Sequence, residues 1–196
     1  ATRLATYRRA DDTVMVCDLA SGTRLAIGRF TGAGAEAIAV DDDGAVALGG
    51  RGLVGYYGVD DGRFQPGVSV DVRFGGELVD IGPIALRGGR VAAAVDPRSG
   101  SGPSRVAIWD AAERAIAVQF ETDHPDVAAV ALLGDDAEML AVGGRSQPGG
   151  DVVIEVWESE SRRRLGRGLG GLVGDVLALG GDETSLTATD GDGRTF

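Results

Sequence analysis

The sequence lacks the residues on which several kinds of site depend. It has one cysteine, Cys17, and one histidine, His124, among 196 residues. A single cysteine excludes an internal disulfide framework and a cysteine-based zinc site. A single histidine cannot form a histidine metal cluster or a histidine–nucleophile pair unless another chain supplies the second group. We therefore predict no catalytic residue, metal or cofactor, and we interpret His124 as structural.

Long apolar runs are also missing. No stretch approaches the roughly 18 apolar residues that a membrane-spanning helix needs. There is no charged-then-apolar leader either, which favours a cytoplasmic location, with an upstream leader left open. Nineteen basic residues stand against 30 acidic ones, for a formal net charge of −11. Such a chain repels phosphate backbones and anionic lipid, so nucleic acid and membranes are not expected partners.

Glycine, by contrast, is abundant. There are 33 glycines, about twice the average share. They stand singly and in pairs between short apolar runs, where turns need a positive φ or a close approach of the backbone. Lysine is absent, which we attribute to coding bias. The runs are too short and too often interrupted for helices, so the sequence predicts an all-β fold.

An internal repeat organises these runs. Short apolar runs end in an aromatic or equivalent residue, often followed by an acid, at residues 14–18, 53–57, 106–110 and 154–158. A fifth copy is predicted at 193–196. The marker positions 17, 57, 109, 157 and 196 lie 39 to 52 residues apart, which is the period of β-propeller blades.

The order of strands within each unit is regular. First strands are predicted at 35–40, 79–86, 127–133 and 173–179, each followed by an acidic or glycine-rich turn. Three further strands follow the first three of these, whereas the last is followed by two, because the chain stops at a third strand. We expect about four and a half repeats of four antiparallel strands. The predicted units are a partial blade at 1–30, blades at 31–72, 73–121 and 122–168, and a partial blade at 169–196. Because both end units are incomplete, we expect the chain to be a segment of a larger propeller. The alternatives are closure by another chain and an atypical small array.

The third-strand markers resemble those of a known family. Trp109 and Trp157, each followed by an acid, resemble the third-strand ending of WD-repeat propellers, and His124 lies near the position of that family's Gly-His pair. Tyr57 and Cys17 replace the tryptophan elsewhere, so the family's buried Asp-His-Ser/Thr-Trp network is expected to be incomplete in most units. The resemblance implies a propeller and, by analogy with bacterial members, the sensing part of a longer multidomain protein.

Candidate binding residues lie in the loops between second and third strands. Gly-Gly-Arg recurs at 49–51 and 143–145, where backbone N–H groups and a guanidinium could hold an anion. The alternative is that the glycines make the turn and the arginine is solvated. Two long loops, 96–105 and 145–151, are predicted on the same face, where insertions often build a binding surface. The binding candidates are therefore Arg51, Arg98, Arg145 and Gln147.

Other motifs have simpler interpretations. The acidic segments 41–44 and 190–193 could suggest calcium, but they lack a complete ligand loop and are typical of hairpin turns. The basic run 162–164 lies between acids and is interpreted as a solvated turn. Trp109, Trp157, Tyr57 and Phe196 recur at the blade period, which predicts packing positions.

Function is predicted at the level of a class. The first hypothesis is a non-catalytic binding or scaffold propeller that recognises a protein or ligand on one face. Its partner would be another protein, or further blades of the same or another chain. The alternative is a hydrolase or lyase with its site at the central channel, which would need paired carboxylates with mutually perturbed pKa values. A third hypothesis is an assembly unit whose open edges pair with another copy.

Overall fold

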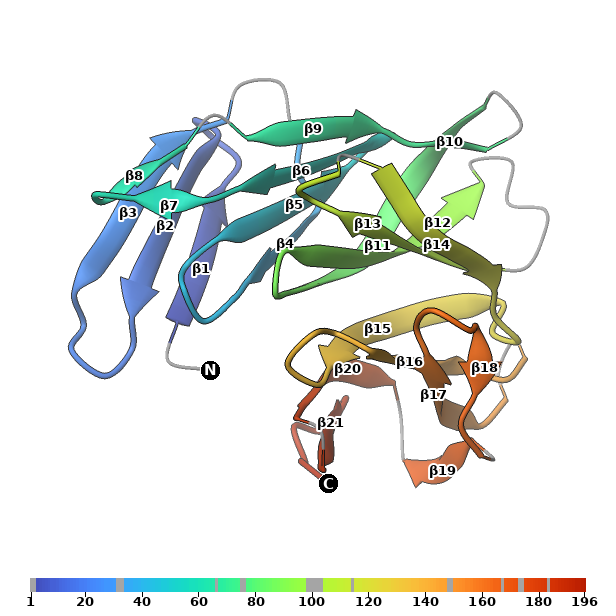
Figure 1. Cartoon of the computed structure of the whole chain (residues 1–196). Helices are drawn as coiled ribbons and strands as arrows, with labels where there is room; N and C mark the ends of the chain where they lie inside the picture. Colours follow the sequence, from blue (N-terminus) through green and yellow to red (C-terminus); the bar gives the residue numbers. More distant parts are fainter. Residues whose placement is uncertain are drawn as a thin grey trace.

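The computed structural model confirms the all-β prediction (Figure 1). The residues that the structure describes are 3–30, 34–65, 67–74, 77–97, 104–113, 115–147, 150–166, 168–172, 175–182 and 184–196. Every regular element in these ranges is a β-strand, and the ladders are antiparallel throughout. Within the same ranges no helix exists that is long and apolar enough to cross a membrane.

The first two sheets follow the predicted order of strands. The first sheet lacks a leading strand and consists of β1 (Arg3–Arg8), β2 (Thr13–Asp18) and β3 (Arg24–Arg29). The second sheet consists of β4 (Ala37–Val40), β5 (Val46–Gly50), β6 (Leu53–Tyr57) and β9 (Val68–Asp71). A small extra hairpin, β7 (Val59–Asp60) and β8 (Arg63–Phe64), interrupts the connection from β6 to β9.

The remaining sheets keep the antiparallel order but differ in their number of strands, and the fourth takes in residues 169–172, which were predicted to begin the fifth unit. The third consists of β10 (Arg73–Phe74), β11 (Glu77–Arg87), β12 (Arg90–Pro97), β13 (Arg105–Asp110) and β14 (Ala115–Glu121). The fourth consists of β15 (Asp126–Leu133), β16 (Met139–Arg145), β17 (Val152–Glu158), β18 (Arg163–Arg164) and β19 (Leu169–Leu172), with β18 and β19 both paired to β17. The fifth consists of β20 (Val176–Gly181) and β21 (Leu186–Asp190), and Thr195 bridges to Thr189 where the fifth marker was predicted.

Alternation along each strand separates two faces. In β2, Val14 and Val16 are fully buried while the residues between them are partly exposed, as the period of two requires. The buried faces form four apolar clusters, and each cluster joins one sheet to the next along the chain. Stability therefore comes mainly from the packing of one sheet against its neighbour.

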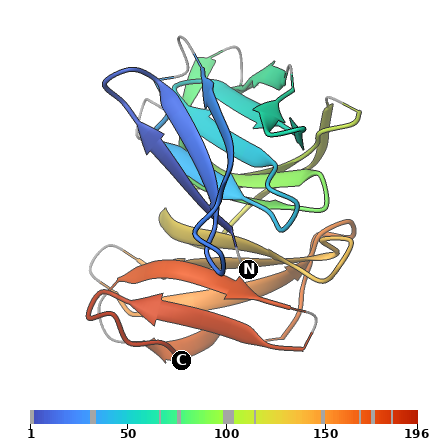
Figure 2. The ribbon, with the colours of Figure 1, turned by 90° about the vertical axis from the view of Figure 1, so that its left-hand side faces the viewer.

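The sheets follow one another in an arc (Figure 1), and the view in Figure 2 shows the yellow-to-red sheets packed beneath the blue-to-green ones. Their first strands, β4, β11, β15 and β20, contact one another in that order. They line a central space of about 320 Å³ whose described walls are apolar, including Ile38, Ile84, Val130 and Leu179. The structure thus confirms blades arranged around a common centre.

An arginine links two blades that are not neighbours in the chain. The guanidinium of Arg87, at the end of β11, donates to the carbonyl oxygen of Gly181 at the end of β20, at 3.2 Å. The same guanidinium lies 3.9 Å from the carboxylate of Asp135, in the turn between β15 and β16. Arg87 therefore joins the third blade to the fourth and the fifth at one end of the central space.

The paired glycines do not make turns, which corrects one of the two interpretations above. Gly49 and Gly143 lie within β5 and β16. A Cβ on Gly49 would lie 2.6 Å from the side chain of Ile81, and one on Gly143 would lie 3.2 Å from Val176. Glycine lets side chains from the first strand of the next blade pack directly on the backbone, with the tighter contact at Gly49.

Three of the four marker aromatics pack as predicted. Trp109 is buried between the second and third sheets, Trp157 stacks on Phe120 with ring centroids 4.9 Å apart, and Tyr57 packs against the cluster around Val14. The prediction was wrong for Phe196, which is 57% exposed. The backbone of Phe196 pairs with Ala188, but no described strand covers its ring.

Candidate functional site

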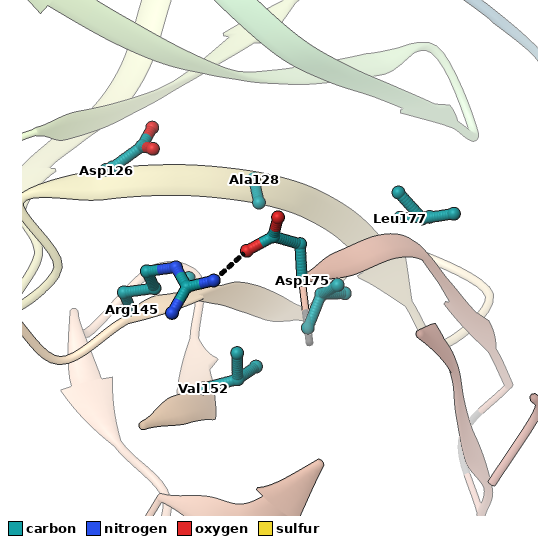
Figure 3. Close-up of a pocket in the computed structure, with 8 residues that line it drawn as sticks. Asp126, Ala128, Arg145, Val152, Asp175 and Leu177 are labelled. Carbon is teal, nitrogen blue, oxygen red and sulfur yellow. Dashed lines mark hydrogen bonds and ion pairs between the residues drawn. The ribbon is translucent and has the colours of Figure 1, made fainter. Parts of the chain in front are cut away.

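A pocket of about 400 Å³ lies where the fourth and fifth blades meet (Figure 3). It is bounded by the ends of β15, β16 and β17 and by the start of β20. We call it the Arg145 pocket. Its lining consists of Asp126, Ala128, Gly144, Arg145, Val152, Asp175, Val176 and Leu177. Charged groups of both signs and aliphatic walls therefore meet in one recess.

An ion pair lies at the centre of this recess. Arg145 Nη2 is 2.5 Å from Asp175 Oδ1, and Arg145 Nη1 donates to the carbonyl oxygen of Gly150 at 3.1 Å. The side chains of Arg145 and Asp175 are 35% and 63% exposed, so solvent or a ligand can reach both. Exposed ion pairs contribute little to the stability of the fold. The Arg145–Asp175 pair could therefore exchange partners with a ligand at little cost to stability.

Local backbone structure fixes the positions of these groups. Asp126 pairs with Arg145 in the ladder of β15 and β16, and a bulge follows because Ala128 has no partner there. A Cβ on Gly144 would lie 2.3 Å from the carbonyl oxygen of Asp126. The two strands thus come together more closely than any other residue would allow. Bulges of this kind redirect side chains beside binding sites.

A buried polar network supports the pocket from beneath. His124 is 1% exposed, and its Nδ1 lies 3.3 Å from the carbonyl oxygen of Arg145. His124 Nε2 is 3.6 Å from a carboxylate oxygen of Glu155, which is 3% exposed. Arg164 binds the other oxygen of Glu155 and also Asp123. The cationic partner of Glu155 thus comes from the basic run predicted to be a solvated turn. Arg164 is 39% exposed, as that prediction requires, but its guanidinium also binds a buried carboxylate.

This network differs from the one that the WD-repeat resemblance implies. The indole N–H groups of Trp109 and Trp157 have no hydrogen-bond partner among the described residues. His124 instead holds a backbone carbonyl and lies beside Glu155. His124 is buried, as a structural histidine would be, but its Nε2 has no hydrogen-bond partner among the described residues. The family's tryptophan-centred network is not formed at these positions.

The other predicted binding residues lie elsewhere. Arg51 follows β5, is 75% exposed and lies 3.7 Å from the carboxylate of Glu36. Gln147 lies in the loop after β16 with an exposed side chain, and its carbonyl oxygen accepts from Gly150 at 2.8 Å. Arg98 lies outside the described residues. Of the described candidates, Arg145 alone lines the pocket.

Sequence reasoning missed both carboxylates of the Arg145 pocket. Asp175 comes immediately before β20, and Asp126 is the first residue of β15. An acid also precedes β4, where Glu36 approaches Arg51. An acid just before a first strand, matched with an arginine at the end of a second strand, was therefore a signal present in the repeat.

A second pocket lies at the opposite ends of the strands. It has a volume of about 340 Å³ and is lined by the turn 41–43 and by Leu86, Arg87, Gly88 and Asp135. The segment 41–44 forms the predicted hairpin turn, in which the backbone N–H of Asp43 donates to the Asp41 carboxylate at 3.0 Å. The segment after Asp190 is likewise a turn, with Gly193 at φ 78°. No described group of three or more acidic, histidine or cysteine side chains could hold a metal.

Burial raises the pKa of Asp41 to about 7, and its hydrogen bond with the Asp43 side chain acts in the same direction. In the unfolded chain the pKa of Asp41 is near 3.8. Between about pH 4 and 7 the folded chain therefore holds a proton on Asp41 that the unfolded chain has lost. The stabilisation from this proton is complete below about pH 4 and disappears as the pH rises to about 7. We expect Asp41→Asn to remove this loss of stability between about pH 4 and 7. Thermal melts at several pH values across that range would measure the effect.

The control for Asp41→Asn is Asp182→Asn. Hydrogen bonds from Thr184 and Ser185 lower the pKa of Asp182 to about 2, so its contribution changes below pH 4 and leaves the upper range unaffected. If the difference in melting temperature between Asp41→Asn and wild type stayed constant from pH 4 to 7, the assignment of this proton to Asp41 would be wrong.

Comparisons with solved structures identify the architecture. The structure of U3-55K, a WD40 protein, superposes with a TM-score of 0.67 at 18% identity, over 99% of this chain and 56% of that one. The Dos1 propeller gives 0.58 at 13% identity, over 94% of this chain and 49% of that one. The fold is a β-propeller. No family profile matches the sequence, and no curated protein matches it.

These similarities are too low in identity to transfer residue roles. They show the fold alone. The chain spans about half the length of the two propellers that it matches.

Proposed function

We propose that this propeller is a non-catalytic recognition module, and that it binds a segment of another protein at the Arg145 pocket. The observation that carries the proposal is the exposed Arg145–Asp175 pair, set between aliphatic walls and held from beneath by His124. A cationic and an anionic group side by side suit a partner segment that carries both charges, or a chain terminus with a polar group beside it.

Rigidity supports this proposal. The pocket is formed by strand ends and not by long loops, and the close approach of Gly144 to Asp126 fixes the spacing of its walls. Because its side chains are already positioned, binding would cost little conformational entropy. The propeller class of the structural neighbours agrees with an interaction role.

A hydrolase or lyase is the alternative, and one observation favours it. Asp41 and Asp43 share a hydrogen bond, have oppositely shifted pKa values, and line a pocket with Arg87. Against it, the described walls of the central space are apolar, whereas hydrolysis there would need convergent carboxylates. Turnover of ester or phosphate substrates that is lost in Asp41→Asn would favour the alternative.

The binding proposal predicts different effects for two similar arginines. With purified chain as bait, a partner identified by mass spectrometry would be remeasured by calorimetry against Arg145→Ala and Arg51→Ala. We expect Arg145→Ala to weaken binding about tenfold or more, because a charge-assisted hydrogen bond is lost. Arg51→Ala, which removes an exposed arginine at the equivalent strand end, should change the affinity less than about twofold. Equal affinity for both variants would contradict the proposal.

We also infer that the module is the sensing or interaction part of a longer multidomain protein. The support is the WD-repeat resemblance of the third strands and the roughly twofold length of the matched propellers. Further blades, or the domains attached to them, would then be partners in addition to the segment bound at the Arg145 pocket.

A further inference from the structure

A further recess lies on the outer edge of the first two blades, away from the Arg145 pocket. It has a volume of about 540 Å³ and is lined by residues of β3 and of the extra hairpin β7–β8. The hairpin lies beside β3 and contacts it (Figure 1). We call it the aromatic groove. Its described lining is Ile27, Gly28, Arg29, Phe30, Tyr57, Arg63, Phe64, Gln65 and Gly67.

Three aromatic rings form one wall of the groove. Phe30 meets Tyr57 edge to face with centroids 4.1 Å apart, and meets Phe64 in the same manner at 5.1 Å. A Cβ on Gly28 would lie 2.7 Å from the Phe64 ring, so glycine lets the hairpin dock on β3. Ile27 is 47% exposed. The groove therefore offers a preformed aromatic and aliphatic surface.

Two arginines at this groove have no anionic partner among the residues that the structure describes. Arg29 and Arg63 are exposed, and neither forms an ion pair with a described carboxylate. The hydrogen bond from Arg8 lowers the pKa of Asp11 most, and the charge of Arg29 acts in the same direction. The Asp11 carboxylate is thus already hydrogen-bonded to Arg8, with Arg8 Nε 2.8 Å from Asp11 Oδ1. Most described arginines, Arg145 among them, are ion-paired. In a chain with net charge −11, two such cations in the lining of one apolar groove suit an anionic ligand.

The groove also reaches the outer edge of a sheet. β3 is the last strand of its sheet and, among the described strands, forms a ladder only with β2, although β8 packs beside it. The groove lining includes residues 27–30 of this segment. Backbone groups on a free edge are the usual site where an extended peptide adds a strand, while adjacent pockets select its side chains.

We propose that the aromatic groove binds an extended peptide segment in which a carboxylate side chain lies close to an aromatic or large aliphatic one. The carboxylate would bind between Arg29 and Arg63, and the apolar side chain would pack on the partly exposed rings of Tyr57 and Phe64, which the buried Phe30 supports. An acidic peptide is favoured over RNA because a few carboxylates need only two cations. A polyphosphate would also be repelled by the acidic surface as a whole.

A display selection on the whole chain tests the proposal and finds the preferred peptide in the same step. Random short peptides would be selected in parallel on wild type and on the double variant Arg29→Ser, Arg63→Ser. We expect the peptides enriched only on wild type to combine an acid with a nearby aromatic or leucine. Fluorescence anisotropy of these labelled peptides should show at least about tenfold weaker binding to the double variant.

The matched control removes the same charge elsewhere. Arg9→Ser, Arg24→Ser replaces two exposed arginines outside the groove that form no ion pair among the described residues, and its affinity should stay within about twofold of wild type. Melts should show both double variants folded. Ile27→Asp should weaken binding without changing Arg29 or Arg63. The proposal is overturned if selection yields no acidic-aromatic peptides, if the two double variants behave alike, or if single-stranded RNA binds the groove more tightly.

Discussion

Replacement of Arg164 by alanine is expected to destabilise the propeller by about 3 kcal/mol, because it leaves a buried carboxylate without its cation. Glu155 is 3% exposed, and one of its oxygens is bonded to Arg164, while the other has no hydrogen-bond partner among the described residues. His124, 3.6 Å away, is too far to replace the lost hydrogen bond without moving. Urea unfolding followed by tryptophan fluorescence would measure the change.

The adjacent arginine provides the control. Arg163 is 69% exposed and lies 3.6 Å from Glu158, whose side chain is 42% exposed. Such surface pairs contribute about 0–1 kcal/mol, so Arg163→Ala should change the unfolding free energy by less than about 1 kcal/mol. Glu155→Gln in the Arg164→Ala background should recover part of the loss, since it removes the buried charge. If Arg163→Ala cost as much as Arg164→Ala, burial of Glu155 would not be the cause.

Gly144→Ala is expected to have the second large effect, a loss of about 2–3 kcal/mol. The added Cβ would lie 2.3 Å from the carbonyl oxygen of Asp126 and 3.2 Å from Cβ of His124. The nearest atom belongs to the backbone of a paired strand, so it cannot move aside as the end of a side chain could. The substitution should therefore force β15 and β16 apart at the bulge and disturb the Arg145 pocket above it.

Gly58→Ala is the matched control for this substitution. A Cβ on Gly58 would meet nothing within 4 Å, and Gly58 is not among the residues with positive φ. Alanine there should leave stability unchanged or raise it by up to about 1 kcal/mol. Denaturant melts of both variants would measure this difference in stability. Binding of the partner at the Arg145 pocket provides a second measurement. A Gly144→Ala protein as stable as Gly58→Ala would contradict the close approach.

The strands were predictable because their signal is local. Alternation along β2, and the acidic turns such as 41–44, follow from the period of two and from turn chemistry. In β17 the alternation fails, because Ile154 and Glu155 are both buried. The hairpin β7–β8 was not predicted, since its strands are two residues long and carry no alternation. Its position depends on Phe64 meeting a glycine of the first blade, a contact that no short-range pattern encodes.

The candidate sites were less predictable, for a related reason. Arg51 and Arg145 follow the same Gly-Gly pair in the sequence, yet only Arg145 lines the pocket between the fourth and fifth blades. The difference lies in Asp175, which comes from the next blade, and in His124, which holds the backbone beneath. Arg164 likewise belongs to an apparently solvated basic run but binds Glu155. Such relationships between elements become visible only when the blades are packed together.

The hydrogen bond from Arg87 to Gly181 has a consequence for how the chain unfolds. Repeat arrays are commonly treated as one-dimensional systems in which each unit is coupled only to its neighbours, so that terminal units fray first and independently. A bond from the third blade to the fifth introduces a coupling between next-nearest units, and it passes over the turn that holds Asp135. Opening of the fifth blade, which has two full strands described, must then also break a bond to the third blade, which adds about 1 kcal/mol to the cost of opening it alone.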